Sequence, residues 1–223
     1  VNGIRAAKRK GIEQWAAKNT PDVWCMQEVR APQNEIDPIF DEFGFEYATA
    51  GRIADQSGLD RMNEICRIKG RAGVGLLSAL PVIDKRYGLP GLAEDVDSGR
   101  WIEADVKTPQ GYTVTVVCVY VHAGNTDDPE KMKQKYRFLD TMLVRMGQRQ
   151  AVLCGDFNIA HTPLDIKNAK ANEKHAGFLP EERAYVDKWL GELEFVDVMR
   201  SLCGDIQGPY TWWSQRGRAF DNN

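Results

Sequence analysis

Apolar residues recur along this chain with two spacings, one typical of strands and one typical of helices. Residues 98–106 alternate apolar and polar positions, and residues 112–121 form a β-branched run, so both are predicted to be strands. The turn sequence at 109–111 lies between them and predicts a hairpin. Residues 129–146 place their apolar side chains on one stripe at helical spacing, which predicts an amphipathic helix.

Shorter apolar runs predict the remaining elements. The polar stretch 51–72 carries five basic residues and is long for a connection in a compact domain, so we expect it to be functional. The other helices are predicted at 4–19, 37–43 and 181–193, and the other strands at 23–26, 45–50, 73–78, 82–87, 151–154 and 210–213.

The strand predicted at 151–154 stops at Gly155 and is followed at once by Asp156 and Asn158. Residues two apart in extended backbone point to the same face, so a carboxylate and an amide lie side by side at this strand end. The carboxylate can accept a proton or bind a metal ion, and the amide can donate to a developing negative charge. The same sequence is also typical of an Asx-type turn, so a purely structural interpretation stays open.

Polar side chains also stand at the ends of three other predicted strands, namely Asn2, Glu28 and Tyr120. Ligands of sheet proteins gather at strand ends, so we expect these residues to form one site with Asp156 and Asn158. Carboxylate and amide oxygens without histidine or cysteine suit Mg²⁺ or Mn²⁺ rather than zinc. The set therefore predicts a site for a hard cation and an anionic substrate.

The size and charge of the chain limit which partners it can bind. Its 223 residues suit a single domain over 1–223 with a real core. The formal net charge of −3 gives no general attraction for nucleic acid, so binding to DNA would need a local basic face. Arg5 and residues 8–10 supply one at the start of the helix 4–19, where the helix dipole disfavours cations and a ligand would explain them. A solvated charged face is the alternative.

The five cysteines are odd in number and form no CxxC pair, and three of them lie in apolar runs. We expect buried, reduced thiols in a cytosolic protein rather than disulfides or a zinc site. No apolar run is long enough to span a bilayer and nothing resembles a signal peptide, so no membrane partner is expected.

Several short strings follow one another in a characteristic order. They are Asn2-Gly-Ile-Arg5, Met26-Gln-Glu28, Gly73-Val-Gly-Leu-Leu-Ser78, Tyr120 after an apolar strand, and Gly155-Asp-Phe-Asn158. In this order they resemble the exonuclease III family, the apurinic/apyrimidinic endonuclease branch of the endonuclease/exonuclease/phosphatase superfamily. The resemblance covers essentially the whole chain. Asp165-Ile166, Phe178-Leu-Pro-Glu-Glu-Arg183 and Phe220-Asp-Asn-Asn223 are similar to the bacterial exonuclease III branch in particular.

The resemblance implies an α/β (α+β) fold, a four-layered α-β-β-α sandwich with two central mixed sheets whose last strands are missing from these residues. It implies that Glu28 is the principal Mg²⁺ ligand and that Asn2 lies near the same metal. Tyr120 would contact the scissile phosphate. Asp156 would activate water or protonate the leaving group, and Asn158 would steady the transition state, with both also counted among the metal-site residues.

The resemblance also implies contacts with DNA. Arg5 and Lys10 match basic positions near the DNA backbone. Trp212 falls where an aromatic side chain lines the pocket for the abasic sugar. His122 follows Tyr120 closely, where relatives have Asn or Gln, and is a further candidate for a DNA contact.

The chain departs from the family pattern at both ends. The family's asparagine before the segment that matches Val1 is absent, and the chain stops at Asn223, before the family's Arg-x-Asp strand and Ser-Asp-His motif. None of His122, His161 and His175 follows a Ser-Asp, so none replaces the family's catalytic histidine. We therefore expect residues 1–223 to be truncated at both ends and to be inactive on their own.

The function implied is that of a Mg²⁺-dependent DNA-repair nuclease, with Mn²⁺ as a substitute metal. It would be a 3′→5′ exonuclease on duplex DNA and would cut 5′ to abasic sites, working as a monomer in the bacterial cytoplasm. One alternative is a phosphoesterase for lipid or inositol phosphates, and another is a non-catalytic DNA-binding protein. The basic cluster and Trp212 favour DNA over lipid, and the complete set of strand-end residues favours catalysis.

Overall fold

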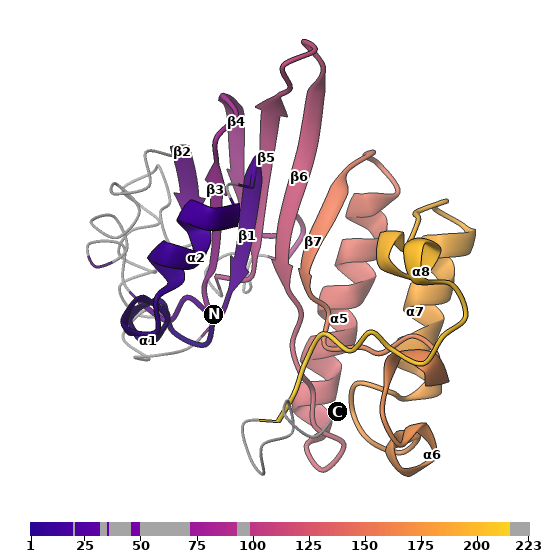
Figure 1. Ribbon diagram of the computed structural model, residues 1–223. Helices are drawn as coiled ribbons and strands as arrows, with labels where there is room; N and C mark the ends of the chain where they lie inside the picture. The colour runs from indigo at the N-terminus through magenta and orange to yellow at the C-terminus, as the bar shows by residue number, and fades with distance from the viewer. Residues whose placement is uncertain (20, 32–34, 36–45, 50–71, 93–98, 215–223) are drawn as a thin grey trace. The chain divides into compact units, whose positions relative to one another are not determined.

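The computed structural model describes residues 1–19, 21–31, 35, 46–49, 72–92 and 99–214 (Figure 1). The chain divides into two compact units, the first made of Val1–His122 with Arg137–Phe157 and the second of Ala123–Tyr136 with Asn158–Asn223. The helix predicted at 37–43, nearly all of the polar stretch 51–72 and the C-terminal string 220–223 lie outside the described residues.

The first unit contains both sheets. The smaller sheet has the strand order β1-β3-β2, in which β1 is Val23–Gln27, β2 is Glu46–Thr49 and β3 is Val74–Ser78. Both of its pairings are antiparallel. The central strand β3 is buried along its whole length, as expected of a strand covered on both faces.

The larger sheet has the order β4-β5-β6-β7. Its strands are β4 (Val82–Tyr87), β5 (Trp101–Lys107), β6 (Thr113–Tyr120) and β7 (Val152–Asp156). β5 and β6 form the predicted antiparallel hairpin, whereas β6 and β7 pair in parallel, so this sheet is mixed. The parallel pairing brings the carboxyl ends of β6 and β7 to the same edge of the sheet.

The two sheets face each other across an apolar core. Val74 and Leu76 of β3 pack in one buried cluster with Ile102 of β5 and Cys118 of β6. Each of these side chains is at most 1% exposed, and Cys118 is a free thiol. Alternating residues of each strand fill this space because successive side chains point to opposite faces of a sheet.

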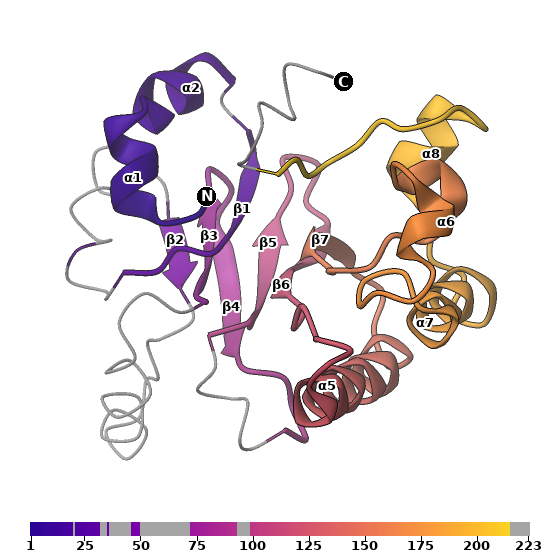
Figure 2. The same ribbon diagram turned by 90° about the horizontal axis from the view of Figure 1, so that it is seen from below.

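Helices cover the outer faces of the sheets (Figure 2). α1 (Ile4–Arg9) and α2 (Ile12–Asn19) lie on the smaller sheet, where Ile4 packs against Met26 and Leu77. The C-terminal part of helix α5 (Pro129–Met146) covers the larger sheet. The first unit therefore has the layers α-β-β-α, and the prediction of an α/β fold with two central sheets is confirmed.

Helix α5 (Pro129–Met146) is the predicted amphipathic helix with the predicted bounds. The Phe138 ring meets the Trp101 ring edge-on at a centroid distance of 6.4 Å. Phe138, Leu139 and Met142 are fully buried, which accounts for the apolar stripe. Neither α5 nor any other described helix has both the length and the apolar character needed to cross a membrane.

The prediction of one helix over 4–19 is wrong. The chain turns at Lys10 and Gly11, and Gly11 has a φ of 87°, a conformation that glycine adopts without a Cβ penalty. Lys8 and Arg9 therefore lie in the last turn of α1, where the helix dipole favours cations. The dipole argument for a ligand at these two residues no longer holds, and only Arg5 lies in a first turn.

The second unit is helical in the residues that the structure describes. It contains the 3₁₀ turn η2 (Pro163–Asp165) and the helices α6 (Ala169–Asn172), α7 (Pro180–Gly191) and α8 (Val198–Cys203). The strand predicted at 210–213 is wrong. These residues pair with no other strand, and the Tyr210 hydroxyl instead accepts a local hydrogen bond from Gln207 Nε2 at 2.9 Å.

Candidate active site

Glu28 lies in a tight turn directly after β1. Its φ is 58°, in the left-handed region that non-glycine residues seldom adopt. The turn is held from two sides, because Gly3 N donates to Glu28 O at 2.7 Å and Val29 N donates to Gly73 O at 3.0 Å. Asn2, with a φ of 51°, immediately precedes Gly3, so the same hydrogen bond keeps Asn2 near the Glu28 backbone.

The Glu28 carboxylate is held by two donors. Oε1 accepts from the Tyr120 hydroxyl at 2.8 Å and from Arg30 NH2 at 2.7 Å. Burial alone would raise the pKa of Glu28, but the hydrogen bonds from Tyr120 and Arg30 outweigh it and lower the pKa below the ordinary 4.5. Glu28 is therefore an oriented carboxylate that is ionised at neutral pH.

Tyr120 is a hydrogen-bond donor at neutral pH. Burial, with the hydrogen bond to Glu28, raises its pKa to about 12. The Arg100 guanidinium lies over the phenol ring, with Cζ 4.7 Å from the ring centroid, and NH1 donates to Tyr120 O at 3.1 Å. The ring is thus fixed on one side by a cation and at its hydroxyl by a carboxylate.

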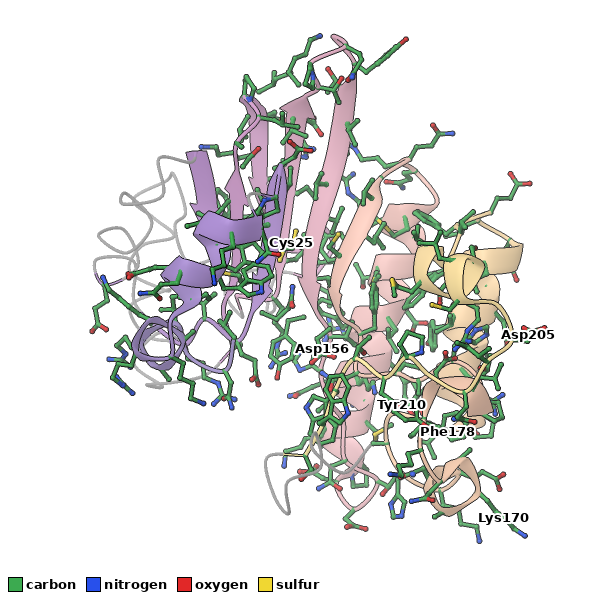
Figure 3. The ribbon with its side chains drawn as sticks, viewed as in Figure 1. Cys25, Asp156, Lys170, Phe178, Asp205 and Tyr210 are labelled. Atoms are coloured by element: carbon green, nitrogen blue, oxygen red, sulfur yellow. The ribbon has the colours of Figure 1, made fainter. Side chains whose placement is uncertain are left out.

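Asp156 ends β7 beside Tyr120. The two residues are paired in register across parallel strands, and Val121 N donates to Asp156 O at 2.9 Å. Residues opposite each other in a sheet project to the same face, so the phenol and the carboxylate leave the sheet on one side. Figure 3 shows Asp156 at this end of β7. The predicted association of Glu28, Tyr120 and Asp156 thus has direct geometric support within the first unit.

Gly155 is the residue that lets β7 approach β6 so closely. A Cβ at this position would lie 2.0 Å from Val119 O and 2.8 Å from Val119 Cγ1. No side chain fits there without movement of the backbone. The glycine that the sequence shows before Asp156 is therefore required by strand packing, independently of any chemistry.

Asn158 belongs to the second unit and follows Asp156 by two residues. Its φ is 49°, and its main-chain carbonyl accepts a hydrogen bond from Lys135 Nζ at 2.8 Å. The left-handed conformation agrees with the turn interpretation of this sequence, and asparagine tolerates it better than most residues. A turn and a chemical role are therefore compatible at this position.

The predicted metal ligands fit a hard cation by their chemistry. Glu28 would supply an ionised carboxylate oxygen, and Asn2, whose neighbour Gly3 is hydrogen-bonded to the Glu28 backbone, would supply an amide oxygen, as Mg²⁺ prefers. Within the described ranges, no three His, Cys, Asp or Glu side chains are grouped as a metal site would need. Glu28 would be the principal carboxylate of the ligand set, with Asn2, Asp156 and Asn158 as the other predicted metal-site residues.

The predicted DNA-contacting residues lie in both units. In the first unit, Lys10 is exposed, Arg5 pairs with Glu35 at 2.9 Å, and the His122 ring packs edge-on against Phe138 at 5.5 Å. In the second unit, Trp212 is 74% exposed. The exposed positions are open to a ligand, whereas His122 has a packing role that sequence reasoning did not foresee.

Sequence reasoning missed Arg30 and Arg100, two cations of the described residues that contact Glu28 and Tyr120. Arg30 lies two residues beyond Glu28, and its charge beside a predicted metal ligand was a signal that could have been used. Arg100 precedes β5, which pairs with the strand that carries Tyr120, so the predicted hairpin already placed it near the phenol.

Replacing Tyr120 by phenylalanine should raise the pKa of Glu28 toward 4.5, because one of its two donors is lost. A carboxylate whose folded-state pKa is lowered contributes stability above its unfolded pKa, and this contribution disappears as pH falls through the folded value. In Y120F the stabilising contribution of the Glu28 carboxylate should therefore begin to disappear at a higher pH than in the wild type. Carboxyl ¹³C titration of Glu28 measures the shift, and Tyr112→Phe, at an exposed side chain, is the control. The same Glu28 pKa in both variants would contradict this prediction.

The four-layered fold, with acidic and phenolic side chains at its strand ends, places the chain among the layered α/β proteins. The chain belongs to the Endonuclease/Exonuclease/phosphatase family, whose model matches residues 1–223. The family predicted from the sequence motifs is confirmed.

Individual relatives agree with this assignment. The chain is 29% identical over 224 residues to an exodeoxyribonuclease of Bacillus subtilis (strain 168), covering 100% of this chain and 81% of the Bacillus protein. It is 29% identical over 228 residues to a DNA-(apurinic or apyrimidinic site) endonuclease of Dictyostelium discoideum, covering all of this chain but 57% of that protein. Among solved structures, an AP endonuclease from Archaeoglobus fulgidus is similar with a TM-score of 0.81 and 27% identity, over 100% of this chain and 79% of that one.

Proposed function

We propose that this protein is a metal-dependent DNA-repair phosphodiesterase, acting as a 3′→5′ exodeoxyribonuclease and as an endonuclease at abasic sites. The observation that carries the proposal is the contact between Glu28 and Tyr120, with Asp156 in register beside the phenol. The similarity to an exodeoxyribonuclease and to AP endonucleases supports DNA as the substrate. Mg²⁺ is the proposed metal, with Mn²⁺ as a substitute.

Each side chain has a defined task in phosphodiester hydrolysis. When substrate binds, the Tyr120 hydroxyl turns its single proton from Glu28 to a non-bridging oxygen of the scissile phosphate, and its raised pKa keeps that proton on the phenol. Asp156 takes a proton from the attacking water or delivers one to the leaving oxygen. The Asn158 amide donates to the charge that develops in the transition state. A Mg²⁺ ion bound at Glu28 and Asn2 would neutralise charge on the phosphate.

The DNA partner is proposed to meet a local basic surface. The chain has a net charge of −3, so Arg5, Lys10 and their neighbours on α1 would supply the phosphate contacts. Trp212 would provide an aromatic surface for the abasic sugar, and His122 a further contact.

We also propose that both units act as one catalytic domain and that the protein works as a monomer in the bacterial cytoplasm. Light scattering in solution tests the oligomeric state.

Glu28→Gln is expected to weaken Mg²⁺ binding about 10- to 100-fold, because a neutral amide replaces the principal carboxylate of the proposed ligand set. Isothermal titration of the full-length protein with Mg²⁺, and with Mn²⁺ as a second probe, measures the affinity directly without any turnover. Glu130→Gln, at an exposed side chain of α5, is the control, because it removes a charge of the same sign from a residue outside the proposed ligand set. Equal Mg²⁺ affinity in both variants would count against Glu28 as the ligand.

A substrate panel separates the proposal from its alternatives. The full-length protein in Mg²⁺ is expected to nick duplex DNA 5′ to an abasic site and to shorten duplex 3′ ends, and to leave inositol phosphates intact. Release of phosphate from an inositol phosphate without cleavage of DNA would favour the phosphoesterase alternative. Tight binding of abasic duplex without cleavage would favour a non-catalytic DNA-binding protein.

A further inference from the structure

Lys135 and Glu182 form a fully buried ion pair inside the second unit. Lys135 Nζ lies 2.5 Å from Glu182 Oε1, and both side chains are 0% exposed. Burying two charges is costly, and replacing such a pair by neutral side chains is often neutral or stabilising. A stabilising role alone therefore gives a weak account of this pair, and its surroundings point to another.

The Lys135 ammonium group meets three oxygens with its three donors. Besides Glu182 it donates to Asn158 O at 2.8 Å and to Ala123 O at 3.2 Å. One of the three acceptors is thus the main chain of a residue proposed to act on the substrate. A buried charged donor fixes such a carbonyl more strongly than a neutral one, because charge-assisted hydrogen bonds are stronger.

Glu182 holds the same region from the other side. Its Oε2 accepts from Gly177 N at 2.6 Å and from Leu179 N at 3.0 Å. Gly177 O in turn accepts from Ala160 N at 2.8 Å, and a Cβ on Gly177 would lie 3.2 Å from Asn158 O. The ion pair therefore joins the Asn158 turn to the segment that packs against it.

The Asn158 backbone is in a conformation that needs such support. A left-handed φ in a residue other than glycine costs free energy and persists only where neighbouring contacts enforce it. This backbone sets the direction in which the Asn158 Cα–Cβ bond leaves the chain, so the carbonyl contact limits the positions that the side-chain amide can reach.

We propose that the Lys135–Glu182 pair is a positioning device for Asn158. It holds the carbonyl of Asn158 so that the side-chain amide is presented to the phosphate in the correct direction. The inference rests on the proposed function, in which Asn158 donates to the transition state. Lys135 and Glu182 act through Asn158 and need not touch the substrate.

A second buried ion pair on α5 serves as the matched control. Arg145 donates to Glu103 through Nε and NH2, both at 2.6 Å, and the buried Glu103 also accepts from Arg86 Nε at 2.9 Å and from Trp101 Nε1 at 3.1 Å. None of the predicted site residues takes part in these hydrogen bonds. Neutralising this pair also removes two opposite charges that anchor α5, but it leaves the Asn158 turn intact.

The experiment compares the full-length double variants K135M/E182Q and R145M/E103Q with the wild type. Removing both charges avoids leaving one of them buried and unpaired, so each double variant is expected to fold. We expect kcat on abasic duplex to fall about 10- to 100-fold in K135M/E182Q, since small displacements of a catalytic group have effects of this size. KM should stay within about 3-fold of wild type, and R145M/E103Q should keep the wild-type kcat.

An NMR measurement of the selectively labelled Asn158 amide and carbonyl provides a readout that does not depend on turnover. Both resonances should shift in K135M/E182Q and stay in place in R145M/E103Q. Wild-type kcat in K135M/E182Q would overturn the inference, as would equal losses in both double variants. If the wild type cuts no DNA in Mg²⁺, the proposed function fails. In that case the NMR comparison still tests whether the ion pair positions Asn158. Unshifted Asn158 resonances in K135M/E182Q would overturn the positioning inference.

Discussion

Replacing Asp156 by asparagine is expected to lower the turnover of abasic DNA by about 10³-fold, within the range that general acid–base groups contribute. The amide has nearly the same shape, so β7 should keep its place beside β6 and Tyr120 its register partner. It cannot take up or deliver the proton that hydrolysis moves. The loss should therefore appear in kcat and not in the affinity for DNA.

Single-turnover cleavage of an abasic duplex by the full-length protein measures the chemical step, and titration with labelled duplex measures binding. Asp205→Asn, in an exposed loop of the second unit, is the control for removing an aspartate charge. A wild-type cleavage rate in D156N would show that Asp156 does not move the proton. An equal loss in D205N would point to a general effect of charge.

Local patterns were sufficient to predict the elements that carry the site. The β5–β6 hairpin and helix α5 follow from alternation and from a helical stripe, both of which are read within a few residues. The bounds of α5 were predicted correctly because a proline starts it and its apolar stripe ends at Met146. The polar residues at the ends of the predicted strands then indicated that Tyr120 and Asp156 lie at the same edge of the sheet.

Features that depend on distant contacts were not predictable in this way. The break at Gly11 leaves the apolar spacing almost unchanged, so the periodicity continues through it. The aromatic string 210–213 reads as a strand, but a strand needs a partner that the described second unit does not provide. Lys135 lies in α5 like any helix-surface lysine, and only the fold brings Glu182 to it.

Sequence reasoning identified the carboxylate and the phenol of the candidate site but missed its arginines. Glu28 and Tyr120 stand at the ends of separate strands, and their 2.8 Å contact agrees with the expectation that strand ends gather. Arg30 and Arg100 bring positive charge to these side chains, and the sequence signals for them were only their positions near Glu28 and beside the predicted hairpin. The fold was needed to show that this carboxylate and this phenol are each paired with an arginine.

Replacing Gly155 by alanine is expected to lower the free energy of unfolding by about 3 kcal/mol or more, at the upper end of overpacking effects. The added Cβ would lie 2.0 Å from Val119 O, which is backbone and cannot rotate away. To relieve this clash, β7 must move away from β6, to which it is paired in parallel. Because Asp156 is the next residue, its carboxylate would move with the strand and leave its register with Tyr120.

Chemical denaturation monitored by tryptophan fluorescence measures the free energy of unfolding. Gly191→Ala is the matched control, since a Cβ at Gly191 meets nothing within 4 Å. That substitution should leave the free energy of unfolding unchanged or raise it by about 0.5 kcal/mol, because alanine reduces the conformational entropy of the unfolded chain. If G155A were as stable as G191A, the close approach of β7 to β6 would be wrong. If G155A were destabilised but cleaved abasic DNA at the wild-type rate, the displacement of Asp156 would be wrong, because a carboxylate outside its register with Tyr120 could not keep the reaction geometry.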